Sequence, residues 1–549
     1  MKYVIGLLGL LYACKPQDKT EPIETFYYKS VQIDQQTVNS SAVYGVGRQP
    51  NITISFAAPV DQSSARNAIK LIASTSATEI PVTYSFGTAD STVVITPQSP
   101  LNALSAYSLE IQATLISKKQ TPLNTSVQAR LITEIDQTDK FPILSDSLLL
   151  DQVQKQTFAY FWDFGHPTSG MARERNSSGD VVTSGGTGFG IMAIIVAVKR
   201  GFITRKEGLD RISKIASFLK DKTKSYHGAF PHWINGATGE TIPFSTKDDG
   251  ADLVETSYLM QGLLTARQFF NTTDATETTL RQTINTLWDN VEWDWFTQGG
   301  QNVLYWHWSP NYNWDMNMPI RGWNEALITY VMAASSRTHT ISQAVYQSGW
   351  AQNGKMANGN TYYGIKLPLG SALGGPLFFE HYSFLGINPR GLSDTYANYE
   401  EQTKAHTLIN YNYCKANPKN YYGYSENCWG LTASDNPSGY SAHEPNNDLG
   451  VITPTAALAS MPYTPTESMN ALRFFYYKLG DKLWKTYGFV DAFNLSNLWF
   501  ADSFLAIDQG PIIVMMENYR SQQIWNLFMS CPEVSTGMKN LGFQSPNLK

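Results

Sequence analysis

The spacing of hydrophobic residues changes once along this 549-residue chain, near Asp136, and that change limits the folds open to it. Between about residue 30 and residue 133, short segments such as NITISF, PVTYSF and STVVITP alternate apolar and polar residues, with turn-rich stretches between them. Alternation with a period of two is typical of β-strands that have one buried face. About seven such strands in about 100 residues predict a small all-β sandwich over residues 30–135.

After a short polar link, DQTDKFPILSD, the hydrophobic period becomes about 3.6, which is typical of helices. Thr204, and Thr464 in the sequence TPTE, are expected to act as helix N-caps. Many helices without alternating strands predict a mainly α domain over residues 144–549, for which an (α/α)6 toroid with a cleft between its loops is the natural arrangement. Helical patterns occur in segments 148–164, 188–201, 204–222, 251–270, 275–291, 324–336, 465–488 and 510–530.

Charge and aromatic content narrow the class of ligand. The formal net charge is -5 and no basic stripe is present, which argues against a nucleic-acid partner. Aromatic residues make up 13% of the chain and charged residues only 16%, a balance that suits a protein presenting flat apolar faces to a polar, uncharged ligand. Sugars fit this description, so we expect an oligosaccharide or polysaccharide ligand.

The N-terminal segment predicts a lipid anchor. Residues 3–13 form an apolar run that is too short to cross a bilayer, and the sequence LYAC that ends it resembles a bacterial lipobox. We therefore expect residues 1–14 to be a lipoprotein signal peptide with Cys14 as the lipidated residue, followed by a polar tether over residues 15–29. Such a protein would be anchored in the bacterial envelope, in the periplasm or on the outer membrane surface. An ordinary soluble N-terminus is the alternative.

The other cysteines predict neither a metal site nor a disulfide scaffold. Only Cys414, Cys428 and Cys531 remain, and no CxxC motif is present. Cys414 and Cys428 are the candidate pair for a single disulfide, which the sequence alone leaves open. We expect no cofactor and no metal.

Cleavage of a glycosidic bond needs an acid and a second carboxylate, so carboxylates close to aromatic residues are the candidates. Asp248, Asp252 and Glu255 are four and then three residues apart, which would place all three on one face of a helix near its first turns. Like charges at that spacing repel, so a ligand or a chemical task is expected to compensate them. The alternative is that Asp249 or Asp252 only caps the helix.

A second group of residues lies between positions 305 and 331. Glu325 is expected at the N-terminal end of a helix among aromatic rings, where a raised pKa would suit a general acid. A Glu placed there to complement the helix dipole is the alternative. Four tryptophans surround the charged and polar residues of this group: Trp306, Trp308, Trp314 and Trp323 around His307, Asp315, Arg321, Asn324 and Glu325.

Other segments allow two interpretations each. Asp508 precedes an apolar helix and is either a catalytic carboxylate or an N-cap. The glycine-rich segment 183–196 lacks the spacing of a phosphate-binding loop, so it favours close backbone packing around a cleft. Arg173, Glu174 and Arg175 form either an ion network or sugar contacts. A long loop over residues 424–448 holds four further candidates that the sequence does not rank: Glu426, Asp435, His443 and Glu444.

Six motifs occur in order in segments 161–175, 186–205, 227–270, 320–336, 424–435 and 500–520, among them FWDFGHPTSGMARER, IRGWNEALITYVMAASS and FADSFLAIDQGPIIVMMENYR. Together they resemble the glycoamylase-like domain of Bacteroidetes proteins and glycoside hydrolase family 144, whose characterised members are endo-β-1,2-glucanases. More distantly they are similar to a domain of cyclic β-1,2-glucan synthases. Segments ISFAAPVD, STVVITPQSPL and YSLEI of the first region resemble bacterial Ig-like modules.

The family resemblance implies an (α/α)6 toroid and an enzyme that hydrolyses β-glucan, with β-1,2-glucan as the expected substrate. We expect the protein to be a monomer. The alternatives are a glucoamylase- or β-glucosidase-like hydrolase of another linkage, a glycan-binding lipoprotein without catalysis, and a lyase on a similar toroid. The resemblance implies that five acids line the substrate cleft, Asp248, Asp252, Glu255, Glu325 and Asp508, with Glu325 a leading candidate for the essential acid. The catalytic candidates are Glu325, Asp252, Glu255 and Asp508. Substrate contacts are expected from a wider set: Asp248, Trp233, His232, Trp306, Trp308, Trp314, Arg321, Trp323, Glu426 and Trp429.

Overall fold

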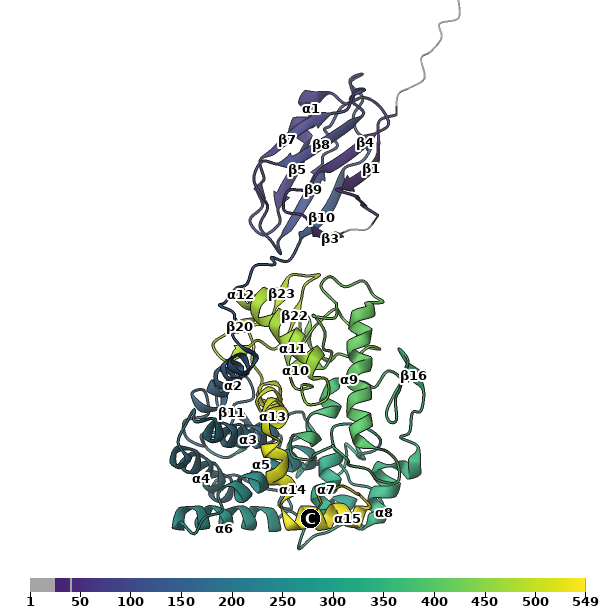
Figure 1. Ribbon diagram of the computed structural model, residues 1–549. Coiled ribbons are helices and arrows are strands. Elements are labelled where there is room, and N and C mark those ends of the chain that lie inside the picture. The colour runs from purple at the N-terminus through teal and green to yellow at the C-terminus, as the bar shows by residue number, and fades with distance from the viewer. Residues whose placement is uncertain (1–24, 40–41, 549) are drawn as a thin grey trace, which may run out of the picture. The chain divides into compact units, whose positions relative to one another are not determined.

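The computed structural model describes residues 25–39 and 42–548, and it divides into two compact units between Ile135 and Asp136 (Figure 1). Cys14 and residues 15–24 of the predicted tether lie outside the described residues. Within the described part of the chain, no helix combines the length and the apolar character needed to cross a membrane.

The first unit is a β-sandwich of two five-stranded sheets, with strand orders β2-β1-β4-β8-β7 and β3-β10-β9-β5-β6. All pairings are antiparallel except that of β3 with β10, which is parallel. Both sheets contribute to one hydrophobic core, for example through Ile54 and Val93 from one and Leu109 and Leu131 from the other. The predicted sandwich is therefore present, with more strands than the sequence indicated.

The elements of this unit are β1 (Tyr28–Ile33), β2 (Gln36–Thr37), β3 (Ala42–Val46), β4 (Ile52–Phe56), α1 (Gln62–Ala68), β5 (Ile69–Ala73), β6 (Thr78–Glu79), β7 (Val82–Phe86), β8 (Thr92–Pro97), β9 (Ala106–Ile111) and β10 (Val127–Thr133).

The second unit is rich in helices joined by long loops that carry two- to four-residue strands. Its helices are α2 (Asp146–Trp162), α3 (Ser184–Arg200), α4 (Arg205–Asp221), α5 (Leu253–Phe269), α6 (Ala275–Asp289), α7 (Leu327–Ser335), α8 (Gln343–Val345), α9 (Tyr399–Ala416), α10 (Pro454–Leu458), α11 (Pro465–Arg473), α12 (Gly480–Leu483), α13 (Ala506–Ser521), α14 (Gln523–Met529) and α15 (Pro532–Leu541). Its strands are β11 (Val181–Thr183), β12 (Trp233–Asn235), β13 (Thr241–Ile242), β14 (Ala251–Asp252), β15 (His307–Trp308), β16 (Thr361–Tyr362), β17 (Ile365–Lys366), β18 (Ala433–Asn436), β19 (Gly439–Ala442), β20 (Trp484–Lys485), β21 (Gly488–Phe489), β22 (Phe493–Asn494) and β23 (Trp499–Phe500).

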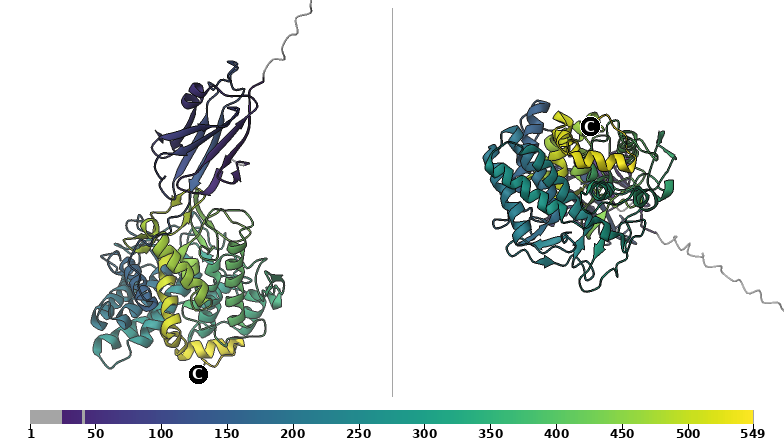
Figure 2. Two further views of the ribbon diagram at one scale, coloured as in Figure 1. Left: turned by 45° about the horizontal axis from the view of Figure 1, so that its top comes forward. Right: turned by 90° about the horizontal axis from the view of Figure 1, so that it is seen from below.

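Helices from opposite ends of this unit pack together. The late helix α13 lies against α2 and α3, so yellow and blue helices are neighbours in both sets of views (Figure 1, Figure 2). The helix α3 in turn packs along α5. The start of α3 therefore lies beside the starts of both α5 and α13: the Gly185 N–H donates to Glu255, and a Cβ atom on Gly186 would lie 2.7 Å from the Cβ atom of Ala506.

Glycine permits the close approach of α3 and α5. A Cβ atom on Gly188 would lie 2.1 Å from the carbonyl oxygen of Tyr258, and one on Gly262 would lie 2.2 Å from the carbonyl oxygen of Gly188. Side chains larger than hydrogen would force the two backbones apart. The close packing predicted for the glycine-rich segment 183–196 is confirmed.

The structure contains one of the two helix N-caps predicted from the sequence. Thr204 caps α4 in a reciprocal capping box with Glu207, as expected. Thr464 is at the N-cap position of α11, but its side chain makes no capping hydrogen bond. Cys414 and Cys428, the candidate disulfide pair, are both buried free thiols.

Candidate active site

A cavity of about 310 Å³ lies at the N-terminal end of α5 and collects residues from segments far apart in the sequence. Six of the predicted site residues line it: His232, Asp248, Asp252, Glu255, Trp306 and Glu325. The rest of its wall is mostly aromatic or apolar and includes Phe244, Tyr258, His307, Met318, Phe378, Tyr382 and Tyr440. The cavity therefore combines several carboxyl groups with flat apolar faces.

The three carboxylates at α5 do meet, although they do not share a helical face. Only Glu255 is within the helix. Asp252 is the N-cap and accepts hydrogen bonds from the backbone N–H groups of Val254 (3.0 Å) and Glu255 (2.9 Å). Asp248 lies in the loop before β14. Because β14 pairs with β15, with Asp252 opposite His307, the loop brings Asp248 back beside the helix start.

Two histidines lie within ion-pair distance of these acids. His232 Nδ1 is 3.1 Å from Asp252 Oδ2, and His307 Nε2 is 3.3 Å from Asp248 Oδ2 and 3.7 Å from Asp252 Oδ2. Burial lowers the pKa of His232, but the carboxylates of Glu255, Asp252 and Asp248 outweigh burial and raise that pKa to about 9. His232 is thus a cation at neutral pH, and it compensates part of the negative charge.

The acids around His232 differ in protonation. Burial tends to raise the pKa of Asp252, but the hydrogen bond with His232 and the nearby histidine charges hold it below its usual value. Burial and the Asp252 carboxylate raise the pKa of Asp248 to about 8. Asp252 is therefore ionised at neutral pH, whereas Asp248 is mostly protonated and able to donate a hydrogen bond to a ligand.

Glu255 joins the starts of two helices. Its Oε2 accepts hydrogen bonds from the Gly185 N–H (2.7 Å) and the Thr183 hydroxyl (3.0 Å) at the beginning of α3. Burial raises the pKa of Glu255. These contacts fix Glu255 between α3 and α5 and commit one of its oxygens to the protein.

Glu325 lies two residues before α7, not within the helix as the sequence pattern indicated. Its carbonyl oxygen accepts hydrogen bonds from Ser383 Oγ (2.5 Å) and the Tyr258 hydroxyl (3.4 Å), so its backbone is held on two sides. Burial raises the pKa of Glu325 to about 7, and the carboxylates of Asp252 and Glu255 add to this effect. Such a group can hold and release a proton near neutral pH.

Asp508 does not line this cavity itself, although the preceding residue, Ile507, does. It is buried in the first turn of α13. Burial and then the carboxylate of Asp491 raise its pKa well above the usual range.

The predicted aromatic contacts are only partly present. Trp306 lines the cavity, and Trp233 packs edge-on against Phe244 beside it. Trp323 and Trp429 are buried and donate hydrogen bonds from Nε1 to Glu380 Oε1 (2.9 Å) and the Glu467 carbonyl oxygen (3.3 Å). Neither ring offers a face to a ligand, so the interpretation of these two as sugar contacts is corrected.

Four further predicted contacts lie outside the cavity. Trp308 and Trp314 pack on Trp295, with ring centroids 5.4 Å and 4.7 Å away. Arg321 is exposed. Glu426 forms an exposed ion pair with Lys415, with Lys415 Nζ 3.3 Å from Glu426 Oε2. The cavity thus gives these residues no direct part in binding.

A metal ion is one group that the acids could hold. His232, Asp248 and Asp252 each offer a ligand atom, and these atoms lie within 4.8 Å of one another. The same side chains also have partners without a metal, because His232 is hydrogen-bonded to Asp252 and His307 is close to Asp248.

Comparison with known proteins places this geometry in a family. The Glycoamylase family model, described as "Putative glucoamylase", matches residues 317–532, and a bacterial Ig-like domain model, Big_5, matches residues 30–131. A solved structure from Bacteroides uniformis ATCC 8492 with the same glucoamylase description is 60% identical, with a TM-score of 0.74, and the match covers 74% of this chain and 100% of that one. The chain belongs to the glycoamylase family. The resemblance inferred from the ordered motifs is confirmed.

Two other similar proteins have named activities. The endo-β-1,2-glucanase of Chitinophaga pinensis, solved with sophorotriose and glucose, is 52% identical, with a TM-score of 0.72, and the match covers 74% of this chain and 100% of that one. An exo-β-1,2-glucooligosaccharide sophorohydrolase (non-reducing end) of Parabacteroides distasonis is 48% identical over 420 residues. That match covers 72% of this chain and 58% of the sophorohydrolase, so the glycoamylase-family chain spans less than two thirds of its length.

Proposed function

We propose that this protein is a glycoside hydrolase that cleaves β-1,2-glucan. The observation that carries the proposal is Glu325, a carboxyl group whose pKa is about 7, at a cavity that also holds an ionised Asp252 and aromatic walls. Sugar recognition by aromatic faces and proton donation by a buried acid both fit this arrangement. The two relatives with named activities, both directed at β-1,2-linked glucans, support the same linkage.

In the proposed reaction, Glu325 protonates the glycosidic oxygen of the leaving sugar, and a second carboxylate activates water or attacks the anomeric carbon. Asp508 and the acids at α5 are the candidates for the second role. Asp248, with a pKa of about 8, donates a hydrogen bond to a sugar hydroxyl, and cationic His232 keeps Asp252 ionised beside it. The aromatic wall, including Trp306 and Tyr440, supplies apolar faces for the sugar rings.

We further infer that the helices of the second unit close into an (α/α)6 toroid with the cavity at one end. The packing of late helix α13 on early helices α2 and α3 supports closure. The proposed enzyme acts as a monomer.

The protein lacking residues 1–14 is expected to release disaccharides or short oligosaccharides from β-1,2-glucan and to act poorly on starch. Chromatography of the products from a panel of linkage-defined glucans measures both. Rapid release of glucose from starch together with no cleavage of β-1,2-glucan would overturn the proposed linkage. Binding of β-1,2-glucan without any product would instead favour a glycan-binding protein.

We also propose attachment to the bacterial envelope through Cys14, on the basis of the LYAC sequence. Cys14→Ser is expected to abolish incorporation of a labelled fatty acid and to release the protein from the membrane fraction. An unchanged distribution between membrane and soluble fractions would contradict lipid attachment.

A further inference from the structure

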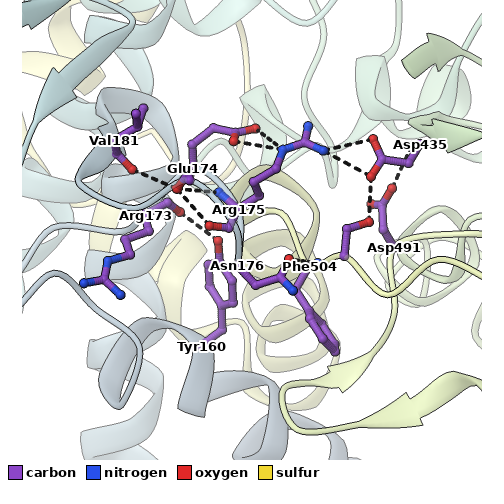
Figure 3. Close-up of polar contacts among 11 residues, drawn as sticks. Tyr160, Arg173, Glu174, Arg175, Asn176, Val181, Asp435, Asp491 and Phe504 are labelled. Atoms are coloured by element: carbon purple, nitrogen blue, oxygen red, sulfur yellow. Dashed lines mark hydrogen bonds and ion pairs between the residues drawn. The ribbon is translucent and has the colours of Figure 1, made fainter. Parts of the chain in front are cut away.

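A second charged cluster lies beside the active-site cavity and is built from four separate segments: the loop before β11, strand β18, the loop after β21 and the start of α13. Arg175 lies between two acids, as Figure 3 shows. Its Nε donates to Glu174 Oε1 (3.1 Å) and Oε2 (3.0 Å), and its Nη1 donates to Asp435 Oδ1 and Oδ2 (both 3.2 Å). Asp435 is therefore oriented by a two-oxygen contact with a cation.

Asp435 in turn fixes Asp491. The backbone N–H of Asp435 donates to Asp491 Oδ2 at 2.7 Å (Figure 3). Ser503 Oγ donates to Asp435 Oδ2 at 2.6 Å. One oxygen of Asp491 is thus committed to the backbone. The other, Oδ1, is buried and receives no hydrogen bond from an N–H or hydroxyl group within the part of the chain that the structure describes.

Asp508 also has a buried oxygen that lacks a donor. It is buried, and its Oδ2 also receives no hydrogen bond from an N–H or hydroxyl group of any described residue. A hydrogen bond between the two side chains lowers the pKa of Asp491 and raises the pKa of Asp508. An ionised carboxylate only accepts hydrogen bonds, so two carboxyl groups can form such a bond only when one of them carries a proton.

This pair affects the wall of the cavity. Ile507, Tyr382 and Tyr440 line the cavity. After burial itself, the negative charge of Asp508 is the largest cause that raises the pKa of the Tyr382 and Tyr440 hydroxyls. A change in the charge of the pair therefore changes the electrostatic potential at the cavity wall, where a sugar would lie.

We propose that Asp491 is a positioning residue for Asp508: the two buried side chains share one proton, and Arg175 and Asp435 orient Asp491 so that the pair keeps one negative charge beside the cavity. The inference deepens the proposed function and rests on it, because Asp508 is one of the candidates for the second catalytic carboxylate. It assigns to Asp491 control of the pH at which Asp508 ionises.

The groups that face the pair set the direction of the expected effects. Burial and the charge of Asp435 raise the pKa of both acids, and the resulting pKa of Asp491 is about 7. Arg175 lowers the pKa of both. Tyr382 and Tyr440 are neutral at the pH of interest because burial and the nearby acids raise the pKa of their hydroxyls. Asp491 and Arg175 therefore act on Asp508 in opposite directions.

The first test is the pH profile of kcat/KM on β-1,2-glucan for Asp491→Asn. Asn keeps an acceptor for the Asp435 N–H and offers an N–H donor to the Asp508 carboxylate. The pKa of Asp508 is expected to fall. The limb of the pH profile that reports ionisation of the Asp491–Asp508 pair should therefore move to lower pH by about one unit or more. Arg175→Gln should move the same limb to higher pH, and Arg175→Lys, which keeps the charge, should restore most of the wild-type position.

The second test does not need activity. A carboxyl group with a raised pKa in the folded state costs stability as pH rises from its unfolded pKa toward its folded pKa. Asp491→Asn relieves part of this cost, so the Tm of the variant relative to wild type should increase steadily between about pH 5 and pH 8. Asp394→Asn is the matched control, since Asp394 also accepts buried hydroxyl hydrogen bonds, from Tyr346 (2.5 Å) and Tyr399 (3.0 Å), away from the cavity.

The outcomes separate the two proposals. A wild-type protein without activity on β-1,2-glucan defeats the proposed function, while the Tm curves still decide whether the proton is shared. A pH-independent difference in Tm, together with unshifted limbs in Asp491→Asn and Arg175→Gln, would overturn the inference. If Asp491→Asn fails to fold, unshifted limbs and an unchanged Tm curve in Arg175→Gln would overturn it, and a shift to higher pH that Arg175→Lys reverses would support it.

Discussion

Glu325→Gln is expected to lower kcat on β-1,2-glucan by about 10² to 10⁴, the range typical of lost general acid catalysis. Gln preserves the size and hydrogen-bonding capacity of the side chain but has no proton to give. Because burial raises the pKa of Glu325 to about 7, wild-type kcat/KM should fall above about pH 7, and this limb should disappear in the residual activity of the variant. Steady-state kinetics between pH 4 and 9 measure both effects.

Binding and stability distinguish lost chemistry from lost structure in this variant. The aromatic wall is untouched, so the Kd for an oligosaccharide should change by less than about tenfold. The folded-state pKa of Glu325 is raised, so the wild-type residue costs stability above its unfolded pKa of about 4.5, and Gln should raise Tm at pH 8 but not at pH 4. Glu401→Gln, on the exposed face of α9, is the matched control and should change neither quantity. Retention of more than about a tenth of wild-type turnover would move the acid role to Asp252 or Glu255.

The sequence predicts the two-part fold because each part has its own hydrophobic period. In β4, for example, buried and half-buried residues alternate from Ile52 to Phe56, and the sequence shows the same alternation. Hydrophobic periodicity does not mark the helix α9, for the opposite reason. Its buried side includes Gln402, His406 and Asn410, so it is not marked by apolar residues. These polar groups are satisfied inside the protein, for example by Glu380, which accepts from Gln402 Nε2 at 2.9 Å and lies 2.8 Å from His406 Nδ1.

Two predicted helices are interrupted for reasons of local geometry. The segment 510–530 divides at Gln522, whose φ of 59° ends α13 before α14 begins. The segment 465–488 passes from α11 through a π-helical turn at Phe474–Lys478 to the short α12. Hydrophobic periodicity continues across both points because both sides are buried, so the pattern could not show the breaks.

Part of the site follows from local sequence and part does not. Asp248, Asp252 and Glu255 are close in sequence, so their meeting could be predicted although the helical face was the wrong geometry. Tyr382 and Tyr440 reach the cavity from distant segments. Tyr440 lies in the long loop 424–448, whose residues the sequence does not rank, and no local motif marks Tyr382. For two tryptophans, the sequence predicts a place in the site that the structure does not give them. Trp323 and Trp429 have the composition of a sugar platform, but tertiary packing buries them in the core.

Asp252→Asn is expected to lower kcat/KM by about 10² or more through weaker binding and slower turnover together. Asn keeps an oxygen that accepts from the Val254 and Glu255 N–H groups, so the cap of α5 should survive. The negative charge next to His232 is lost, so the pKa of His232 should fall from about 9 and the ring should lose its charge near neutral pH. A 10² loss in kcat/KM corresponds to about 2.7 kcal/mol of lost transition-state stabilisation.

Thermal unfolding against pH tests the charge pair behind this prediction. The pKa of Asp252 is lowered, so its contribution to stability is present above its unfolded pKa of about 3.8 and is lost as pH falls. The pKa of His232 is raised, so its contribution is complete below about pH 6.5 and is lost as pH rises through about 9. The Tm deficit of Asp252→Asn should therefore be largest between about pH 4 and 6.5 and should shrink toward pH 9. Asp274→Asn, at the exposed N-cap of α6, where Asp274 accepts from Thr276 N (2.8 Å) and Glu277 N (3.0 Å), should show no such pH dependence. An equal Tm deficit at every pH would mean that Asp252 acts only as a helix cap.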